Sequence, residues 1–213
     1  MTERKAPRRT RERILLASLQ LFNQYGTPSI TTAHISDELN ISPGNLYYHF
    51  RNKEEIVYQL YQQFDKKIEA ALNFPEERTP HVEDLWLLLH LLFEIMWEYR
   101  FLYRDLDDLT ERDKKLGAQF GRVIERGVRT VMEICRGMIA AGTMHANDRE
   151  IEALANNITL VVTYWLSFQK LRRFNNKPES DLKRGAYQVM ALVAPFLVGE
   201  ARELLDKLSQ DYL

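Results

Sequence analysis

The segment from Ser42 to Glu55 starts one helix and, within about two turns, starts another. Ser42 can accept hydrogen bonds from the first free N–H groups of a helix, and Pro43 suits the first helical position, where its missing N–H is not needed. Asn52, with Glu55 three residues later, has the pattern of a capping box and begins the next helix. A helix this short has too little apolar surface to be explained by packing alone.

The residues of the short helix are suited to close contact with a polar polymer. Gly44 has no side chain, and the remaining exposed groups are expected to be an amide, two phenols and an imidazole. They are Asn45, Tyr47, Tyr48 and His49. Leu46 and Phe50 are expected to point into the core.

The residues before Ser42 complete a helix-turn-helix pattern. Thr31 or Thr32 can cap a helix from Ala33 to Leu39, and residues 40–41 then form a tight turn. Two short helices joined by a turn of about three to four residues form the motif whose second helix enters the DNA major groove.

An earlier helix is expected to pack behind this pair. Its apolar residues, at helical spacing, are Ile14, Ala17, Leu21 and Phe22. Gly26 is the expected C-terminal stop, with Pro28 just beyond it.

Residues 9–56 resemble the DNA-binding domain of the TetR family of bacterial one-component repressors. The matching residues are Ala17, Leu21, Phe22, Gly26, Thr32, Ile35, Ser42, Gly44, Leu46, Tyr47, His49, Phe50, Lys53, Glu54 and Glu55. Asn45 departs from the Thr, Ala or Ser often found at its position, so a different operator sequence is expected. The resemblance implies that Tyr47, His49 and Lys53 contact phosphate. For residues 75–213 it supports architecture only.

Side-chain chemistry assigns further roles within the short helix. Asn45 can bond bidentately to adenine and is the best candidate for direct base readout. Hydroxyl, imidazole and ammonium groups suit phosphate contacts, which position a protein without specifying sequence. For Tyr48 the alternative is partial packing against the first helix. The complete set of predicted DNA-binding residues is Thr32, Ser42, Gly44, Asn45, Tyr47, Tyr48, His49, Lys53, Arg8 and Arg9.

Charge is unevenly distributed along the chain. Residues 1–53 hold eight Lys and Arg against four Asp and Glu, whereas the remainder holds 21 against 26. Such asymmetry is expected when one half meets nucleic acid. The positive charges form a basic arm of Arg4, Lys5, Arg8, Arg9, Arg11 and Arg13. The arm is either a solvated terminus or, beside a helix-turn-helix, a segment that follows the backbone or enters the minor groove.

The rest of the chain is predicted to be helical, so the fold class is all-α. Residues 53–72 lack Gly and Pro and have helical periodicity, and no alternating strand pattern or hairpin turn follows. Further helices are expected at 82–99, 101–109, 111–141, 149–174 and 181–208. The glycines within 111–141 suggest more than one helix, and Pro195 suggests a kink or register change. We expect a DNA-binding domain at 1–56 and an effector-binding and dimerisation domain at 57–213.

Two late helices suggest a second copy of the chain as a partner. The helices at about 149–174 and 181–208 both carry long apolar faces, more than a domain of this size is expected to bury beside an apolar central helix. The resemblance implies dimerisation through a four-helix bundle formed by the last two long helices. A twofold dimer suits a palindromic operator in double-stranded DNA.

An aromatic-rich region suggests a pocket for a small-molecule effector. His90 and Glu94 lie four residues apart on the apolar helix, where they are a buried polar pair, the polar groups of a cavity or two ligands of an incomplete metal site. The predicted pocket residues are Trp86, His90, Phe93, Glu94, Trp97, Tyr103, Phe120, Tyr164 and Phe168.

Other classes of protein are disfavoured. The five histidines are scattered, and no nucleophile motif, Gly-rich phosphate loop or Cys/His metal cluster is present, so we expect no enzyme, cofactor or metal. The single cysteine, Cys135, excludes an internal disulfide, suits the cytoplasm and lies on an apolar stripe. No segment has the roughly 18–20 apolar residues of a membrane span, so no membrane partner is expected.

Overall fold

The computed structural model describes residues 7–73, 80–172 and 178–210, and all regular structure in these ranges is helical. The all-α prediction is therefore confirmed. The elements are α1 (Pro7–Tyr25), α2 (Thr32–Glu38), α3 (Pro43–His49), α4 (Lys53–Leu72), α5 (Val82–Glu98), α6 (Arg100–Arg104), α7 (Leu106–Arg112), α8 (Lys114–Ala140), α9 (Asp148–Leu171), α10 (Pro178–Val193), the 3-10 turn η1 (Ala194–Phe196) and α11 (Gly199–Ser209). In the described ranges no helix is both long and apolar enough to cross a membrane.

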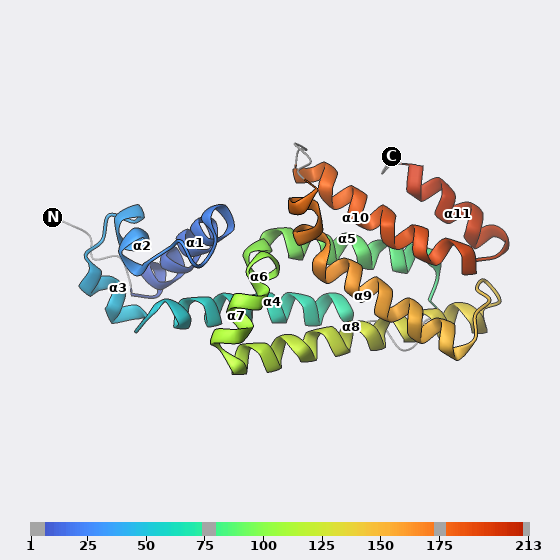
Figure 1. The fold of residues 1–213 in the computed structure, drawn as a ribbon, viewed down its shortest axis with the longest axis horizontal. Helices are drawn as coiled ribbons and strands as arrows, with labels where there is room; N and C mark the ends of the chain where they lie inside the picture. Colours follow the sequence, from blue (N-terminus) through green and yellow to red (C-terminus); the bar gives the residue numbers. More distant parts are fainter. Residues whose placement is uncertain (1–6, 74–79, 173–177, 211–213) are drawn as a thin grey trace.

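The first three helices form a small unit at one end of an elongated molecule (Figure 1). Thr31 caps α2, and Asn40 takes a left-handed conformation (φ 51°) in the turn that follows. Ser42 Oγ accepts the N–H of Asn45 at 3.2 Å, with Pro43 in the first turn of α3. The predicted helix-turn-helix is present because both short helices are capped by side chains that their own sequence supplies.

Gly26 ends α1, as predicted. Its φ of +88° lies in the left-handed region, and its N–H donates to the carbonyl of Phe22 at 2.9 Å. Only glycine adopts this conformation without strain, so the chain leaves α1 at this residue.

The long helix α4 runs from the N-terminal three-helix unit into the rest of the molecule, and its predicted bounds of 53–72 are confirmed (Figure 1). Asn52 caps it by accepting the N–H of Glu55 at 2.8 Å. The reciprocal half of the predicted capping box is different, because the Glu55 carboxylate accepts the N–H of Arg51, not that of Asn52, at 2.8 Å. The domain division at residue 56 falls inside α4 and stays a prediction.

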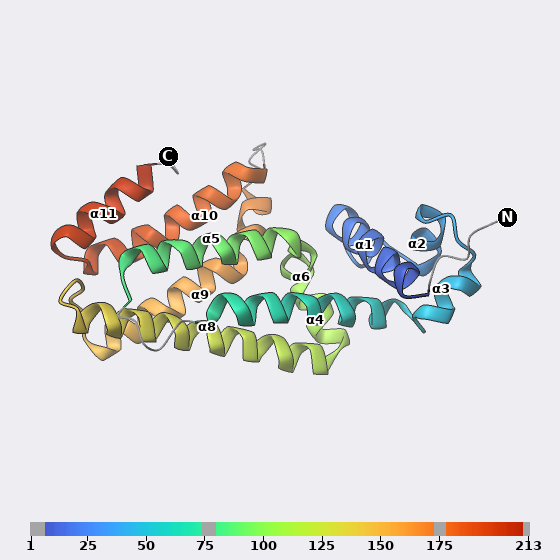
Figure 2. The same cartoon turned by 180° about the vertical axis from the view of Figure 1, so that it is seen from behind.

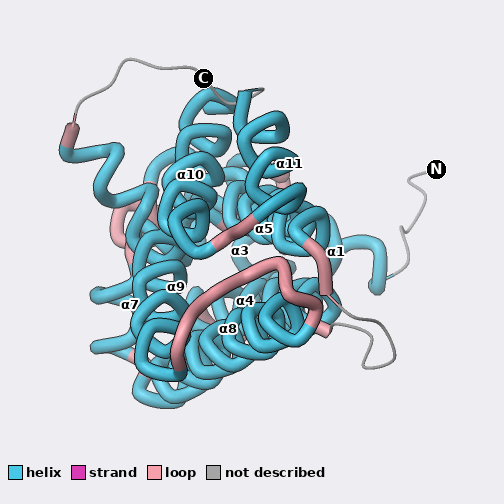
Figure 3. Tube along the Cα trace, turned by 90° about the vertical axis from the view of Figure 1, so that its right-hand side faces the viewer, coloured by secondary structure: helices cyan, strands magenta, loops and turns pink. Residues whose placement is uncertain are grey.

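The larger C-terminal unit is a bundle in which α4 and α8 lie side by side, with α5, α9 and α10 packed above them (Figures 2 and 3). An aromatic cluster lies where α4, α6 and α8 meet. Phe64 stacks on Phe120 with ring centroids 6.0 Å apart, and Tyr103 meets Phe120 edge-on at 5.7 Å. The cluster is buried and joins α4, which leads from the N-terminal three-helix unit, to α6 and α8.

In the middle of the chain one helix prediction was wrong, and for another the helix is confirmed but the suggested break is not. The expected helix at 101–109 is divided into α6 and α7 at Asp105, and the segment 111–141 is one continuous helix, α8, from Lys114 to Ala140. Two of its glycines, Gly117 and Gly137, allow close packing, whereas Gly121 and Gly127 have room for a Cβ. A Cβ at Gly137 would lie 2.4 Å from Pro80, and one at Gly117 would lie 3.3 Å from Thr110.

The expected last helix is also interrupted. Pro195 lies in η1, after which Leu197 and Val198 are extended and Gly199 has φ +58°. Proline removes a helical hydrogen bond and clashes with the preceding turn, so the chain changes direction here and α11 folds back beside α10. The end of the expected helix 149–174 and the loop at 74–79 lie outside the described residues.

Candidate nucleic-acid interface and ligand cavities

Helix α3 presents a polar face to solvent and an apolar face to the core. Leu46 is fully buried and Phe50 is 1% exposed, whereas Tyr47 is 52% and Tyr48 78% exposed. Ser42, Gly44 and Asn45 are also exposed. Packing of Tyr48 against α1 is thus excluded as the main role of its ring.

The two helices of the motif are tied together at this surface. The Thr32 and Tyr47 hydroxyl groups are 3.0 Å apart and share a hydrogen bond. The rings of Tyr48 and His49 meet edge-on at 5.1 Å, and His49 is half-buried. Seven of the predicted residues therefore lie together, on α3, at its start or where α2 contacts it. They are Thr32, Ser42, Gly44, Asn45, Tyr47, Tyr48 and His49.

Lys53 has a partner inside the protein. Its Nζ donates to the carbonyl of Thr27 at 2.8 Å, which holds the segment after α1 against the start of α4. An ammonium group has three N–H donors, so this bond leaves two for a phosphate.

The basic arm was expected to include residues from Arg4 to Arg13, but α1 already begins at Pro7, so most of these residues belong to a helix. Arg9 lies in its first turns and is exposed, and the Arg11 guanidinium lies 4.7 Å from the centre of the Phe50 ring. Arg11 therefore belongs to the packed unit. The side chain of Arg8, and the residues Arg4 and Lys5, lie outside the described part of the chain.

A hydrogen-bond network joins the end of α1 to α6. The Arg104 guanidinium donates to the carbonyls of Phe22 and Asn23 at 2.6 and 3.2 Å. The Asn23 amide donates to the carbonyl of Glu98 at 2.8 Å and accepts the N–H of Phe101 at 3.1 Å. Each bond spans more than 70 positions in the sequence, and no local pattern predicts it.

Two adjoining hollows lie between α8 and its neighbours. An internal cavity of about 50 Å³ is bounded by α4, α5, α6, α8 and α9, and a groove of about 550 Å³ runs along α7, α8 and α9. Both are lined by Phe120, Ile124, Thr159 and Thr163. Of the predicted pocket residues, Tyr103 lines the cavity, Tyr164 the groove and Phe120 both.

The other predicted pocket residues lie elsewhere. Phe93 is buried so close to α10 that a Cβ at Gly185 would lie 2.5 Å from its ring. Phe168 is 47% exposed on α9, and Trp97 lies in a separate cleft between the domains. Helical periodicity identifies these residues as neighbours along a helix, but the rotation of each helix in the bundle decides which way they face.

His90 and Glu94 do not form a buried pair. Glu94 is exposed, while the half-buried His90 ring lies 4.2 Å from that of Trp86, and its Nδ1 is 3.3 Å from the Trp86 carbonyl. Within the described ranges no group of three metal-ligating side chains occurs. Cys135 is 1% exposed and belongs to the core, as predicted.

A capped second helix with an exposed polar face, in a three-helix unit carried by a helical domain, defines a helix-turn-helix DNA-binding protein. Comparison with known proteins agrees. A model described as "Bacterial regulatory proteins, tetR family" matches residues 14–60, and one described as "Bacterial transcriptional repressor" matches residues 63–205. The chain belongs to the TetR family, whose members are transcriptional regulators and not enzymes.

Individual relatives support this assignment. A TetR-family transcriptional regulator from Marinobacter aquaeolei VT8 has a crystal structure that superposes with a TM-score of 0.88 at 38% identity, covering 95% of this chain and 98% of that one. The negative transcriptional regulator IcaR of the biofilm operon in Staphylococcus epidermidis is 30% identical over 54% of this chain and 55% of its own length. The class C tetracycline repressor protein of Escherichia coli is 30% identical over 36% of this chain and 32% of its own length. The chain thus matches about half or less of these two curated relatives.

Proposed function

We propose that this protein is a homodimeric, cytoplasmic repressor that binds a palindromic operator and is released by a small-molecule effector. The observation that carries the proposal is the exposed polar face of α3, on a helix held by its cap and by the hydroxyl contact between Thr32 and Tyr47. A two-turn helix with a buried Leu46 and an outward row of hydrogen-bonding groups matches the recognition helix of the motif.

Within this interface, base readout falls to Asn45 and backbone contact to its neighbours. Asn45 is exposed, so its side-chain amide is available to an adenine edge. Gly44 allows close approach of the backbone. The phosphate contacts are assigned to Thr32, Ser42, Tyr47, Tyr48, His49, Lys53, Arg8 and Arg9.

An apolar stripe on α9 supports the homodimer. Leu160, Tyr164, Phe168 and Leu171 recur at helical spacing and are 58, 46, 47 and 81% exposed. A second copy related by a twofold axis would cover the same stripe on both chains, together with α10. The dimer would then set the spacing of two α3 helices at about 34–36 Å, one turn of DNA.

The inner of the two hollows beside α8 supports an effector whose buried part is uncharged, whereas the adjoining groove has Asp107 in its lining. The lining of the inner cavity is apolar apart from Thr159, Thr163 and Tyr103, and burial raises the pKa of the Tyr103 phenol, which keeps it neutral. An ion placed there would lose its hydration without a counter-charge. The effector class we propose is therefore a mainly apolar molecule with at most hydroxyl or carbonyl groups.

The test is a fluorescence-anisotropy titration of full-length protein against its own upstream region and a shuffled duplex, at several salt concentrations. We expect tighter binding to the upstream region and a negative slope of log affinity against log salt. Equal affinity for both duplexes would contradict the proposal, and so would affinity that does not respond to salt.

A further inference from the structure

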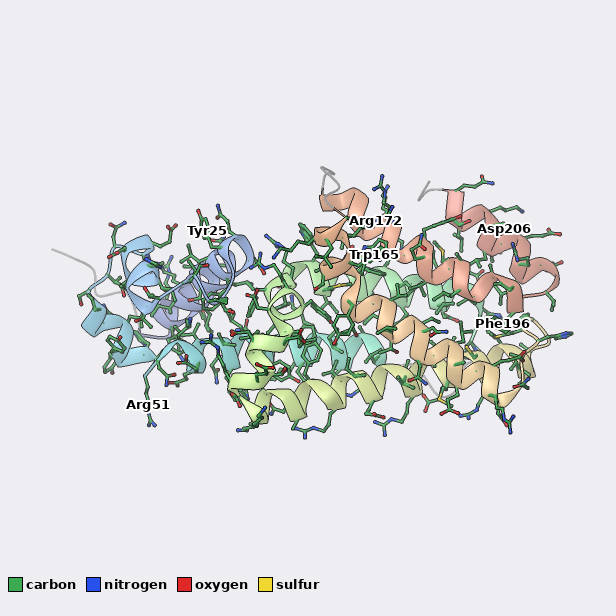
Figure 4. The ribbon with its side chains drawn as sticks, viewed as in Figure 1. Tyr25, Arg51, Trp165, Arg172, Phe196 and Asp206 are labelled. Atoms are coloured by element: carbon green, nitrogen blue, oxygen red, sulfur yellow. The ribbon has the colours of Figure 1, made fainter. Side chains whose placement is uncertain are left out.

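A cleft of about 640 Å³ lies between the DNA-binding unit and the C-terminal domain, apart from the cavity beside α8. One wall is the end of α1 and the turn after it, and the other is formed by α5, α6 and the last turns of α9. Figure 4 shows Tyr25 at the end of α1 nearest the C-terminal domain. A molecule in this cleft would touch both domains at once.

The cleft contains positive charge that the described residues do not balance. Arg100 donates to the Trp97 carbonyl at 3.1 Å and lies 4.5 Å from the centre of the Trp97 ring, but no described carboxylate lies within ion-pair distance of it. Burial, and the nearby charge of Arg104, lower the pKa of Arg100. Lys170 adds a second cation from α9.

The other charged groups in the cleft, Arg104 and Asp105, already have partners within the protein. Asp105 lies 3.3 Å from the Arg104 Nε and accepts two hydrogen bonds from Thr27. Arg104 is also bonded to the two carbonyls at the end of α1. The excess positive charge therefore comes from Arg100 and Lys170, which favours an anion between them.

The uncharged lining of the cleft favours a ring with a hydrogen-bond donor. Trp97 is half-buried and Tyr25 is 55% exposed, so each presents an aromatic surface to the cleft. Gln169 is 7% exposed, and its Oε1 has no hydrogen-bond partner among the described residues. That oxygen is buried without a partner, so a hydroxyl group that reached it from the cleft would supply the hydrogen bond it lacks.

We propose that this interdomain cleft is a second ligand site, which takes an aromatic carboxylate bearing a hydroxyl group. The carboxylate would pair with Arg100 and Lys170, the ring would stack with Trp97 and Tyr25, and the hydroxyl would donate to Gln169. The ligand would bridge α1 to α6 and α9, and so stabilise the relative arrangement of the domains. The proposal does not depend on DNA binding or on the effector site beside α8.

The experiment is isothermal titration calorimetry of the full-length protein with benzoate, 4-hydroxybenzoate and the neutral 4-hydroxybenzamide. We expect saturable binding of the carboxylates at one molecule per chain, and binding of the amide weaker by about tenfold, since the charge-assisted hydrogen bonds are lost. The Arg100→Met variant should weaken carboxylate binding by about tenfold, whereas Arg136→Met, on the exposed face of α8, should leave it unchanged. If Arg100→Met does not fold, Lys170→Met replaces it.

The Gln169→Leu variant separates a ligand contact from a structural role. It removes an acceptor that has no partner, so its thermal stability should be unchanged or higher. Its affinity for 4-hydroxybenzoate should fall about threefold or more while its affinity for benzoate stays the same. The proposal is overturned if neither carboxylate binds, if the amide binds as well as the acid, or if Arg100→Met and Arg136→Met behave alike. Gly127 lines the inner cavity beside α8, so the proposal is also overturned if Gly127→Leu, which places a side chain in that cavity, abolishes binding.

Discussion

Thr27 and Asp105 connect the two domains through a single carboxylate oxygen. The backbone N–H and the hydroxyl of Thr27 both donate to Asp105 Oδ2, at 2.7 and 3.0 Å. Thr27 follows the helix that supports the recognition helix, and Asp105 separates α6 from α7, which borders the groove along α8 and α9. The pair lies between the two regions that an effector-responsive repressor must couple.

Replacing Asp105 with alanine should weaken this junction. Both Thr27 donors would lose their acceptor, so we expect the free energy of unfolding to fall by about 1–3 kcal/mol. Urea denaturation followed by circular dichroism measures it. Asp107→Ala, at an exposed carboxylate one helical position beyond Leu106, is the matched control. A loss of the same size in both variants would show that the Thr27 contact contributes nothing specific.

The Asn45→Ala variant should relax operator preference at one base position. Its side chain is exposed, so folding should be unaffected, while discrimination at that base falls by about 1–3 kcal/mol. Binding to a library of operator variants measures the change.

Tyr48→Phe is the comparison variant for Asn45→Ala, since it should weaken binding to all sequences equally. Lys53→Ala is a less specific test of phosphate contact, because this variant also loses the hydrogen bond from Lys53 to the Thr27 carbonyl. An unchanged preference profile in Asn45→Ala would remove it as a base reader.

The Leu160→Glu variant should convert the dimer to a monomer. A charge at Leu160, the first residue of the α9 stripe, would lie in the proposed interface, where burial of an unpaired carboxylate is unfavourable. Sedimentation velocity would detect the change. Leu87→Glu, at a leucine that is 51% exposed on α5, is the control and should leave the dimer intact. If wild type is already a monomer at micromolar concentration, the stripe has another role.

Filling the small inner cavity beside α8 should prevent binding of an effector that occupies the adjoining groove of about 550 Å³ and extends into this cavity. A Cβ at Gly127 would meet only Thr159, at 3.9 Å, so alanine fits and should stabilise the helix by about 0.5–1 kcal/mol. Leucine would extend into the cavity. We expect the neutral apolar dye N-phenyl-1-naphthylamine to bind wild type and Gly127→Ala but not Gly127→Leu, by fluorescence titration. Equal binding to all three would place the dye elsewhere.

Cys135 should be unreactive in the folded protein. Burial raises the pKa of its thiol from 9.0 to about 11, so at pH 8 little of the nucleophilic thiolate exists. Iodoacetamide labelling, followed by mass spectrometry, should be at least about tenfold slower in buffer than in urea. Because the folded state disfavours the thiolate, stability should also fall as the pH rises from 9.0 toward about 11. Rapid labelling without urea would mean that the core opens at this point.

Helix ends were the most predictable features, because their signals are local. Ser42 and Asn52, the two caps predicted for α3 and α4, each accept a hydrogen bond from the helix that follows them through their own side chain. That α8 continues through its glycines was not predictable from the sequence. Helix propensity disfavours glycine, but Pro80 packs so closely against Gly137 that no larger residue fits there.

The two candidate sites also differ in how well the sequence predicted them, because one depends on local signals and the other on packing. The exposed face of α3 follows from its short length, its caps and its alternation of apolar and polar residues, all of which lie within a dozen positions. The lining of the proposed effector cavity does not follow from the sequence. Of nine predicted lining residues, only Tyr103, Tyr164 and Phe120 border the two hollows beside α8. Which aromatic residues face a cavity depends on how each helix is rotated against its neighbours.

Caps, turns and periodicity act over a few residues, so they were enough to predict that this chain is helical, where most of its helices begin and which short helix carries the exposed polar face. Only the tertiary structure decided how the two domains are joined. The bonds of Asn23 and Thr27 to residues near position 100 cross more than 70 positions, and they form only once α4 has brought α1 beside α6. Long-range hydrogen bonds of this kind depend on the packing of whole helices, which no local pattern specifies.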